Sequence, residues 1–158
     1  MYDAVLHIGD FAYDMDDDDG KVGDEFMRGV EPVAGHVPYM TVAGNHEKHS
    51  NFSEYKNRFT MPGSAENMFY TFDMGPVRFV AICSEFYYYL EYGTHMAINQ
   101  HSWLENVLKE ASTPAARAAH PWLVVYGHRP MYCSDFQSGK DCENKNDLLR
   151  VGIPDEHM

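Results

Sequence analysis

Three apolar runs of this chain end in the same way, at a glycine followed by a side chain able to bind a metal. The runs and their glycines are residues 5–8 with Gly9, residues 39–43 with Gly44, and residues 122–126 with Gly127. Continuous apolar runs are typical of buried parallel strands, and open α/β sheets place their sites beyond the carboxyl ends of such strands. Three such ends side by side would bring together Asp10, Tyr13, Asn45 and His128.

Composition restricts the partners that the chain can bind. Its 158 residues are the size of one domain, and 44% hydrophobic with 23% charged residues is typical of a soluble globular protein. The net charge of -12 disfavours sequence-independent binding to nucleic acid or anionic membranes, because phosphate groups attract clustered Lys and Arg. An anionic substrate would therefore need a metal or histidines at its site. No apolar run approaches the ~20 residues of a membrane span, and no basic region of a signal peptide precedes the first run.

The spacing of apolar residues predicts an α/β fold. Residues 24–35 show helical spacing and end at Gly35, which predicts a helix between the first two strands and a right-handed βαβ unit. Residues 69–72 and 77–83 predict an antiparallel hairpin around a Gly75-Pro76 turn, flanking the parallel core. A second helix is expected over residues 53–59. A third, ending near Ser112, would place on one face Ile98, His101, Leu104 and Leu108.

The cysteines and one short motif bear on the cellular compartment. Cys133 and Cys142 flank a polar loop, where a disulfide would close an exposed turn, and we favour this bridge over two free thiols. Cys83 lies in an apolar run and is expected to be a small core residue. Asn51 begins an Asn-Phe-Ser sequence, which is a glycosylation acceptor if the protein is secreted.

Two runs of unusual composition, one acidic and one aromatic, each have both a functional and a structural interpretation. Carboxylates fill residues 14–19 apart from Met15. We interpret them as a solvated loop before a helix rather than a cation site, because calcium loops need spaced ligands and a turn glycine. Some of these carboxylates would still shape the edge of the site. The aromatic residues 86–89 are interpreted as core or sheet packing rather than a ligand-stacking surface.

Motifs around the three strand ends form a specific combination. They are Gly9-Asp10-Phe11-Ala12-Tyr13, Gly44-Asn45-His46-Glu47, and a histidine that ends an apolar strand in residues 124–128. This combination resembles the calcineurin-like metallophosphoesterases, and more closely the purple acid phosphatases. Residues 127–133 resemble the animal long-form branch. The resemblance covers nearly the whole chain and implies a partial metallophosphoesterase sandwich.

The resemblance implies a role for each residue at the strand ends. Asp10 would bridge two metal ions, and Tyr13 would bind Fe(III) through its phenolate. Asn45 and His128 would bind the second ion, a divalent zinc, manganese or iron. His46 would contact the substrate phosphate and help to protonate the leaving alcohol. Together they imply an acid phosphatase that hydrolyses phosphate monoesters through a metal-bound hydroxide.

The chain departs from the family pattern at both ends. An Asp-x-Gly motif should precede Gly9 and a Gly-His-x-His motif should follow His128, yet neither occurs within residues 1–158. We therefore expect the central part of a catalytic domain, which alone would be inactive or weakly active. The longer parent is expected to be secreted, extracellular or lysosomal. The alternative is a natural short product that binds a metal or a partner without catalysis. Neither the oligomeric state nor the physiological phosphoester is indicated.

Overall fold

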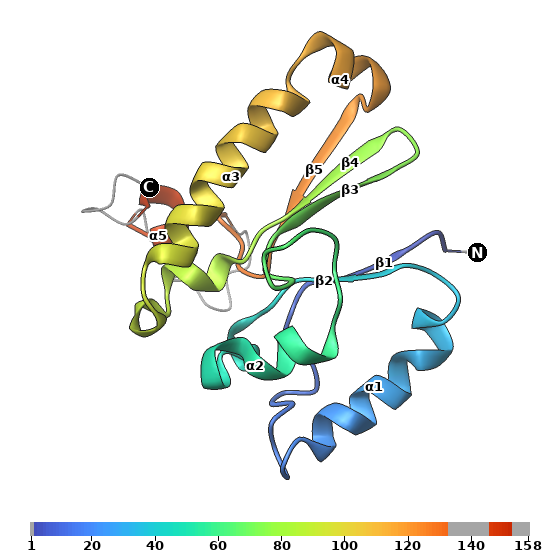
Figure 1. Cartoon of the computed structure of the whole chain (residues 1–158), viewed down its shortest axis with the longest axis vertical. Helices are drawn as coiled ribbons and strands as arrows, with labels where there is room; N and C mark the ends of the chain where they lie inside the picture. The colour runs from blue at the N-terminus through green and yellow to red at the C-terminus, as the bar shows by residue number, and fades with distance from the viewer. Residues whose placement is uncertain (1, 133–145, 153–158) are drawn as a thin grey trace.

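A computed structural model describes residues 2–132 and 146–152 and confirms the α/β fold (Figure 1). The strands are β1 (Val5–His7), β2 (Tyr39–Thr41), β3 (Tyr70–Met74), β4 (Val77–Ala81) and β5 (Trp122–Tyr126). The α-helices are α1 (Lys21–Ala34), α2 (His49–Arg58), α3 (His95–Ala111), α4 (Pro114–Ala119) and α5 (Leu148–Val151). Three 3-10 helices are η1 (Asn45–Glu47), η2 (Ser84–Tyr87) and η3 (Leu90–Tyr92). Among these described residues, no helix is both long and apolar enough to cross a membrane.

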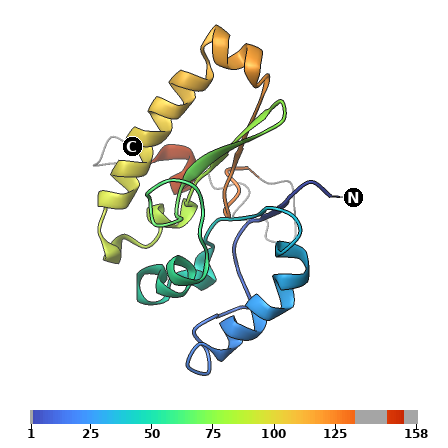
Figure 2. The ribbon, with the colours of Figure 1, turned by 45° about the vertical axis from the view of Figure 1, so that its right-hand side comes forward.

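The predicted parallel pairing of the first two strands across a connecting helix is confirmed. β1 and β2 pair in parallel, with Leu6 opposite Met40, and α1 connects them. α1 ends at Ala34, directly before Gly35 as predicted, but it begins three residues earlier than expected. The residue before its first turn is Gly20, which adopts a left-handed conformation (φ 82°). Figures 1 and 2 show α1 below this strand pair, while α3 runs alongside the other strands.

The other three strands form a second sheet in the order β3-β4-β5. The predicted hairpin is confirmed, since β3 and β4 are antiparallel, while β5 pairs in parallel with β4. The expectation that β5 neighbours β1 and β2 in one sheet is therefore wrong. A side chain joins the two sheets instead, because the Tyr70 hydroxyl of β3 donates to the Thr41 carbonyl of β2 at 2.6 Å. Within the second sheet, the same hydroxyl lies 2.9 Å from the Tyr126 hydroxyl of β5.

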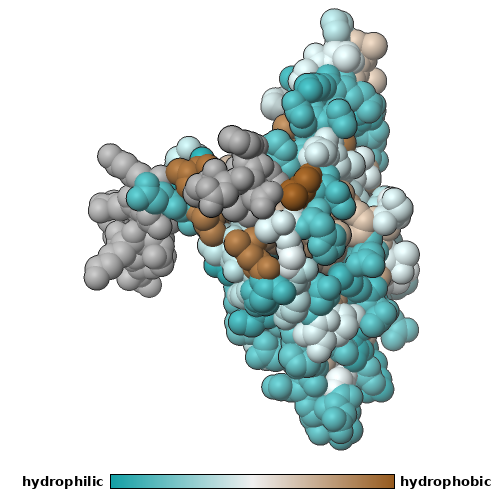
Figure 3. Space-filling model, turned by 60° about the vertical axis from the view of Figure 1, so that its left-hand side comes forward, coloured by the Kyte–Doolittle hydropathy of each residue, from teal (hydrophilic) through white to brown (hydrophobic). Residues whose placement is uncertain are grey.

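β5 is more exposed than its apolar sequence predicts. Trp122 is 67% exposed, and Val124 and Val125 are also exposed. The reason is that β5 lies at the edge of its sheet among the described residues, so one side of the strand has no neighbouring strand there. Figure 3 shows a largely hydrophilic face of the molecule with a few hydrophobic residues gathered near its middle.

The main core lies beneath the loop that follows β1. Phe11 and Met15 from this loop are buried together with Phe52, Tyr55 and Met68. The acidic residues 17–19 of the same loop are exposed and precede α1, which agrees with the interpretation of a solvated loop before a helix. Burial of these two side chains fixes the position of the loop that carries Asp10.

Helix boundaries and faces differ from the sequence expectations in three places. α2 begins at His49, because residues 50–52 add a left-handed turn before the predicted start, and α4 was not foreseen. In α3 the buried positions are Ala97, Gln100 and Ala111, whereas Ile98 and His101 face solvent. Gln100 tolerates burial because its side-chain NH2 donates to the Cys83 carbonyl at 3.0 Å and its side-chain oxygen accepts from the Cys83 backbone N–H at 2.7 Å.

Candidate metal centre

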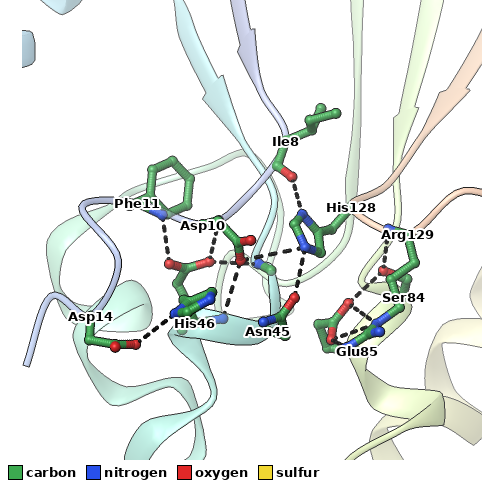
Figure 4. Close-up of polar contacts among 12 residues, drawn as sticks. Ile8, Asp10, Phe11, Asp14, Asn45, His46, Ser84, Glu85, His128 and Arg129 are labelled. Atoms are coloured by element: carbon green, nitrogen blue, oxygen red, sulfur yellow. Dashed lines mark hydrogen bonds and ion pairs between the residues drawn. The ribbon is translucent and has the colours of Figure 1, made fainter. Parts of the chain in front are cut away.

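Side chains from three strand ends meet at one point (Figure 4). The Nε2 atom of His128 lies 3.1 Å from the Asn45 Oδ1 atom and 3.4 Å from the Asp10 Oδ1 atom. Asp10 follows β1, Asn45 opens η1 after β2, and His128 follows β5. The structure therefore brings together three of the four residues that the sequence singles out as metal ligands.

Two glycines allow this approach. Gly9 has a φ of +92°, and a Cβ atom there would lie 2.6 Å from the Gly44 backbone nitrogen and 2.8 Å from His128 Nδ1. A Cβ atom on Gly44 would lie 2.8 Å from the Asp10 backbone nitrogen. A side chain at either position would push the loops apart, so Gly9 and Gly44 are both requirements of the site.

The ring of His128 is oriented by a backbone carbonyl. Its Nδ1 atom lies 2.6 Å from the Ile8 carbonyl oxygen, which can only accept, so Nδ1 carries the proton. In the neutral ring Nε2 then presents a lone pair, and it faces the oxygen atoms of Asp10 and Asn45. Three electron-pair donors that face one another favour a cation between them.

The separations of these donors suit one divalent ion. Ligands that each lie about 2.1 Å from a metal are about 3 to 3.5 Å from one another at tetrahedral or octahedral angles. The 3.1 and 3.4 Å separations at His128 Nε2 fall in this range. Within residues 2–132 and 146–152, no three His, Cys, Asp or Glu side chains are placed to hold a metal together. The present site differs because its third donor is the amide oxygen of Asn45.

Glu47 joins the loops that carry Asp10 and Asn45. Its carboxylate accepts from the backbone N–H groups of Asp10 (2.8 Å), Phe11 (2.7 Å) and Gly44 (2.7 Å), and the residue is only 3% exposed. Burial raises the pKa of Glu47, and the three N–H donors oppose that rise. The sequence motif contains Glu47, but nothing local in it predicts bonds to a loop that lies more than thirty positions earlier.

The loop after β1 has an unusual backbone. Asp10, Ala12, Tyr13 and Asp14 all have positive φ angles, of 60°, 56°, 45° and 95°. Side chains other than glycine rarely adopt this region, and such conformations persist only where surrounding contacts hold them. Here the contacts are the bonds of Glu47 and the buried ring of Phe11.

His46 lies beside the three donors, and Tyr13 packs against His46. The Nδ1 atom of His46 lies 3.0 Å from an Asp14 carboxylate oxygen, and its backbone N–H donates to Asp10 Oδ1 at 3.2 Å. The Tyr13 ring packs against His46 with 4.6 Å between centroids, and Tyr13 is 66% exposed. Asp14 is the one carboxylate of the acidic run with this contact to a site histidine, as expected for a residue that shapes the edge of the site.

The structure tests one of the two cysteine predictions. Cys83 is buried and free, as predicted for a core residue, and burial raises its pKa to about 12. Cys133 and Cys142 lie outside the described residues, so their pairing stays a prediction.

Comparisons with known proteins agree on one family. Residues 1–153 match the calcineurin-like phosphoesterases. The chain is 50% identical over 153 residues to acid phosphatase type 7 of Homo sapiens, which covers 97% of this chain and 34% of that protein. The Danio rerio protein of the same name is 47% identical over 155 residues, or 98% of this chain and 35% of the relative.

A solved structure shares the fold. The purple acid phosphatase from yellow lupin seeds superposes with a TM-score of 0.65 at 26% identity, covering 88% of this chain and 25% of that chain. The chain spans about a third of the length of the curated acid phosphatases it matches. By sequence and by fold, the chain belongs to the calcineurin-like phosphoesterase family and is related to its purple acid phosphatases.

Proposed function

We propose that this chain supplies part of the active site of an acid phosphatase that hydrolyses phosphate monoesters. The observation that carries the proposal is the meeting of the Asp10, Asn45 and His128 donor atoms, with the Nε2 lone pair of His128 directed at the other two. The names of the related proteins, acid phosphatase type 7 and purple acid phosphatase, support the same substrate class.

The residue types suit a pair of unlike metals. Asp10, Asn45 and His128 would hold a divalent zinc, manganese or iron ion, and Asp10 with Tyr13 would contribute to an Fe(III) site. When bound, the metals would supply Lewis acidity that neutralises the phosphoryl oxygens and lowers the pKa of water. The exposed phenol of Tyr13 is accessible to such an ion.

His46 is suited to move a proton at the leaving oxygen. The Asp14 carboxylate, 3.0 Å from Nδ1, holds the ring with a proton on that atom. Nε2 is then the atom that would transfer a proton to the leaving alcohol. The backbone bond from His46 to Asp10 keeps this ring at a constant place relative to the metal donors.

The test combines metal analysis with turnover of p-nitrophenyl phosphate at acidic pH. We expect the 158-residue chain, loaded with Fe(III) and Zn²⁺, to bind the divalent ion and to show little turnover, and a longer parent to be active. In the parent, His46→Asn should lower kcat by about 100-fold or more without loss of metal, as is usual for a general acid. His36→Asn, an exposed histidine on another loop, is the matched control. A parent whose His46→Asn variant keeps full kcat would contradict the assigned role.

A second candidate function rests on the same three donors. The Asn45 and Asp10 oxygens that face His128 Nε2 both belong to the described part of this chain, so three donors for a single divalent ion lie within it. In this alternative the chain binds one divalent ion and does not catalyse. It would be favoured if the longer parent also bound one ion per chain and hydrolysed no phosphate monoester.

We propose a secreted or lysosomal location for the longer parent. Asn51 of the Asn-Phe-Ser motif is exposed, as an acceptor for a glycan must be. Expression in a secreting eukaryotic cell, with and without a glycosidase, tests this proposal. An electrophoretic shift that disappears in Asn51→Gln supports it, and a parent retained in the cytosol contradicts it.

A further inference from the structure

A second polar cluster lies directly beside the candidate metal centre (Figure 4). The Glu85 carboxylate, which is 0% exposed, accepts from Arg129 Nε at 2.9 Å on both oxygens and from Nη2 at 2.8 Å. A buried carboxylate is very costly without such a partner. The position of Arg129 is therefore strictly tied to that of Glu85.

Two neighbours complete the contact. The Ser84 hydroxyl accepts from the Arg129 backbone N–H at 3.0 Å and donates to Glu85 at 2.9 Å. The guanidinium of Arg129 lies 4.1 Å from the centre of the Tyr88 ring. Both the backbone and the side chain of Arg129 are thus held by the segment that follows β4.

Arg129 is the residue after His128, so this cluster fixes one side of the histidine. On the other side, the backbone is held where the Ile82 N–H donates to the Tyr126 carbonyl at 3.0 Å. The ring itself is held through its Nδ1 contact with Ile8. His128 is the one metal donor that comes from the second sheet, so it needs its own anchor there.

We propose that the Glu85–Arg129 pair, together with Ser84, is a positioning element that keeps His128 Nε2 directed at Asp10 and Asn45. The inference rests on the proposed role of His128 in metal binding. A guanidinium fits this task because its planar fork makes two directed bonds, whereas an ammonium makes a point contact.

The test compares two arginine forks in the 158-residue chain. Arg129→Lys keeps the positive charge and removes the paired N–H donors that the guanidinium directs at Glu85. Arg78→Lys is the matched control, since Arg78 binds Asp73 with Nε at 2.8 Å and Nη2 at 3.0 Å in the β3–β4 hairpin. The probe is Co²⁺, followed by titration and by its visible absorption spectrum, with far-UV circular dichroism to verify folding.

We expect Arg129→Lys to weaken Co²⁺ binding by about 10- to 100-fold and to change the spectrum, as is usual when a support of a ligand is lost. Arg78→Lys should change neither. Wild-type affinity and spectrum in folded Arg129→Lys would overturn the inference. If that variant does not fold, Ser84→Ala replaces it, and unaltered Co²⁺ binding in folded Ser84→Ala overturns the inference equally.

One further variant separates this inference from the proposed function. His128→Ala should abolish the Co²⁺ spectrum. If it binds Co²⁺ as the wild type does, the metal site itself is wrong. If His128→Ala loses binding while Arg129→Lys does not, the metal site stands and the positioning role is refuted.

Discussion

Replacing Glu47 with glutamine should lower the free energy of unfolding by about 2 to 4 kcal/mol, because one buried carboxylate holds two loops together. Its Oε2 atom accepts from the backbone N–H groups of Asp10 and Gly44, and its Oε1 atom accepts from Phe11. Glutamine has the same shape, so the substitution changes the hydrogen bonding without opening a cavity.

The magnitude follows from these three bonds. A hydrogen bond to a charged group contributes about 1.5 to 3 kcal/mol and a neutral one about 0.5 to 1.5 kcal/mol. The glutamine oxygen can keep the two bonds of Oε2 in weakened form, but its NH2 group then faces the Phe11 N–H, which loses its acceptor. Since burial raises the pKa of Glu47, the neutral amide regains part of the loss by avoiding a buried charge.

Urea unfolding at neutral pH, followed by circular dichroism, measures this difference. Glu31→Gln on the exposed side of α1 is the matched control, and it should stay within about 0.5 kcal/mol of the wild type. If Glu47→Gln unfolds at the same urea concentration as Glu31→Gln, Glu47 does not hold the loops together and the reasoning fails.

Three further predictions concern single contacts. In Gly44→Ala the methyl carbon would lie 2.8 Å from the Asp10 backbone nitrogen, so this variant should bind Co²⁺ about tenfold more weakly or worse. Gly29→Ala in α1 has no atom within 4 Å of its methyl group, so it should instead raise the free energy of unfolding by about 0.5 to 1 kcal/mol. Tyr70→Phe removes the 2.6 Å bond between the two sheets and should cost about 1 to 3 kcal/mol in urea unfolding; equal midpoints would refute this. Burial lowers the pKa of His7 below 6.5, so below that pH the unfolded chain binds more protons than the folded chain, and stability should fall as the pH drops. His7→Phe should make the midpoint of thermal unfolding depend less on pH in this range.

Local sequence patterns were sufficient for the secondary structure around the site. Continuous apolar runs with an intervening helical period predict β1, α1 and β2, and a Gly75-Pro76 turn predicts the hairpin, because both patterns depend on residues near one another in the chain. The same patterns identified Asp10, Asn45 and His128 as candidates, since a glycine after an apolar run marks where a strand ends.

Contacts between distant segments could not be predicted in this way. Membership of β5 in the second sheet depends on its pairing with β4, and the burial of Gln100 depends on the backbone of Cys83. The partners of Glu47 and Arg129 lie in other loops, 37 positions away for Asp10 and 44 for Glu85. Residue types limit which bonds a side chain can form, but folding brings the partners within reach, and the burial of a carboxylate then makes those bonds obligatory.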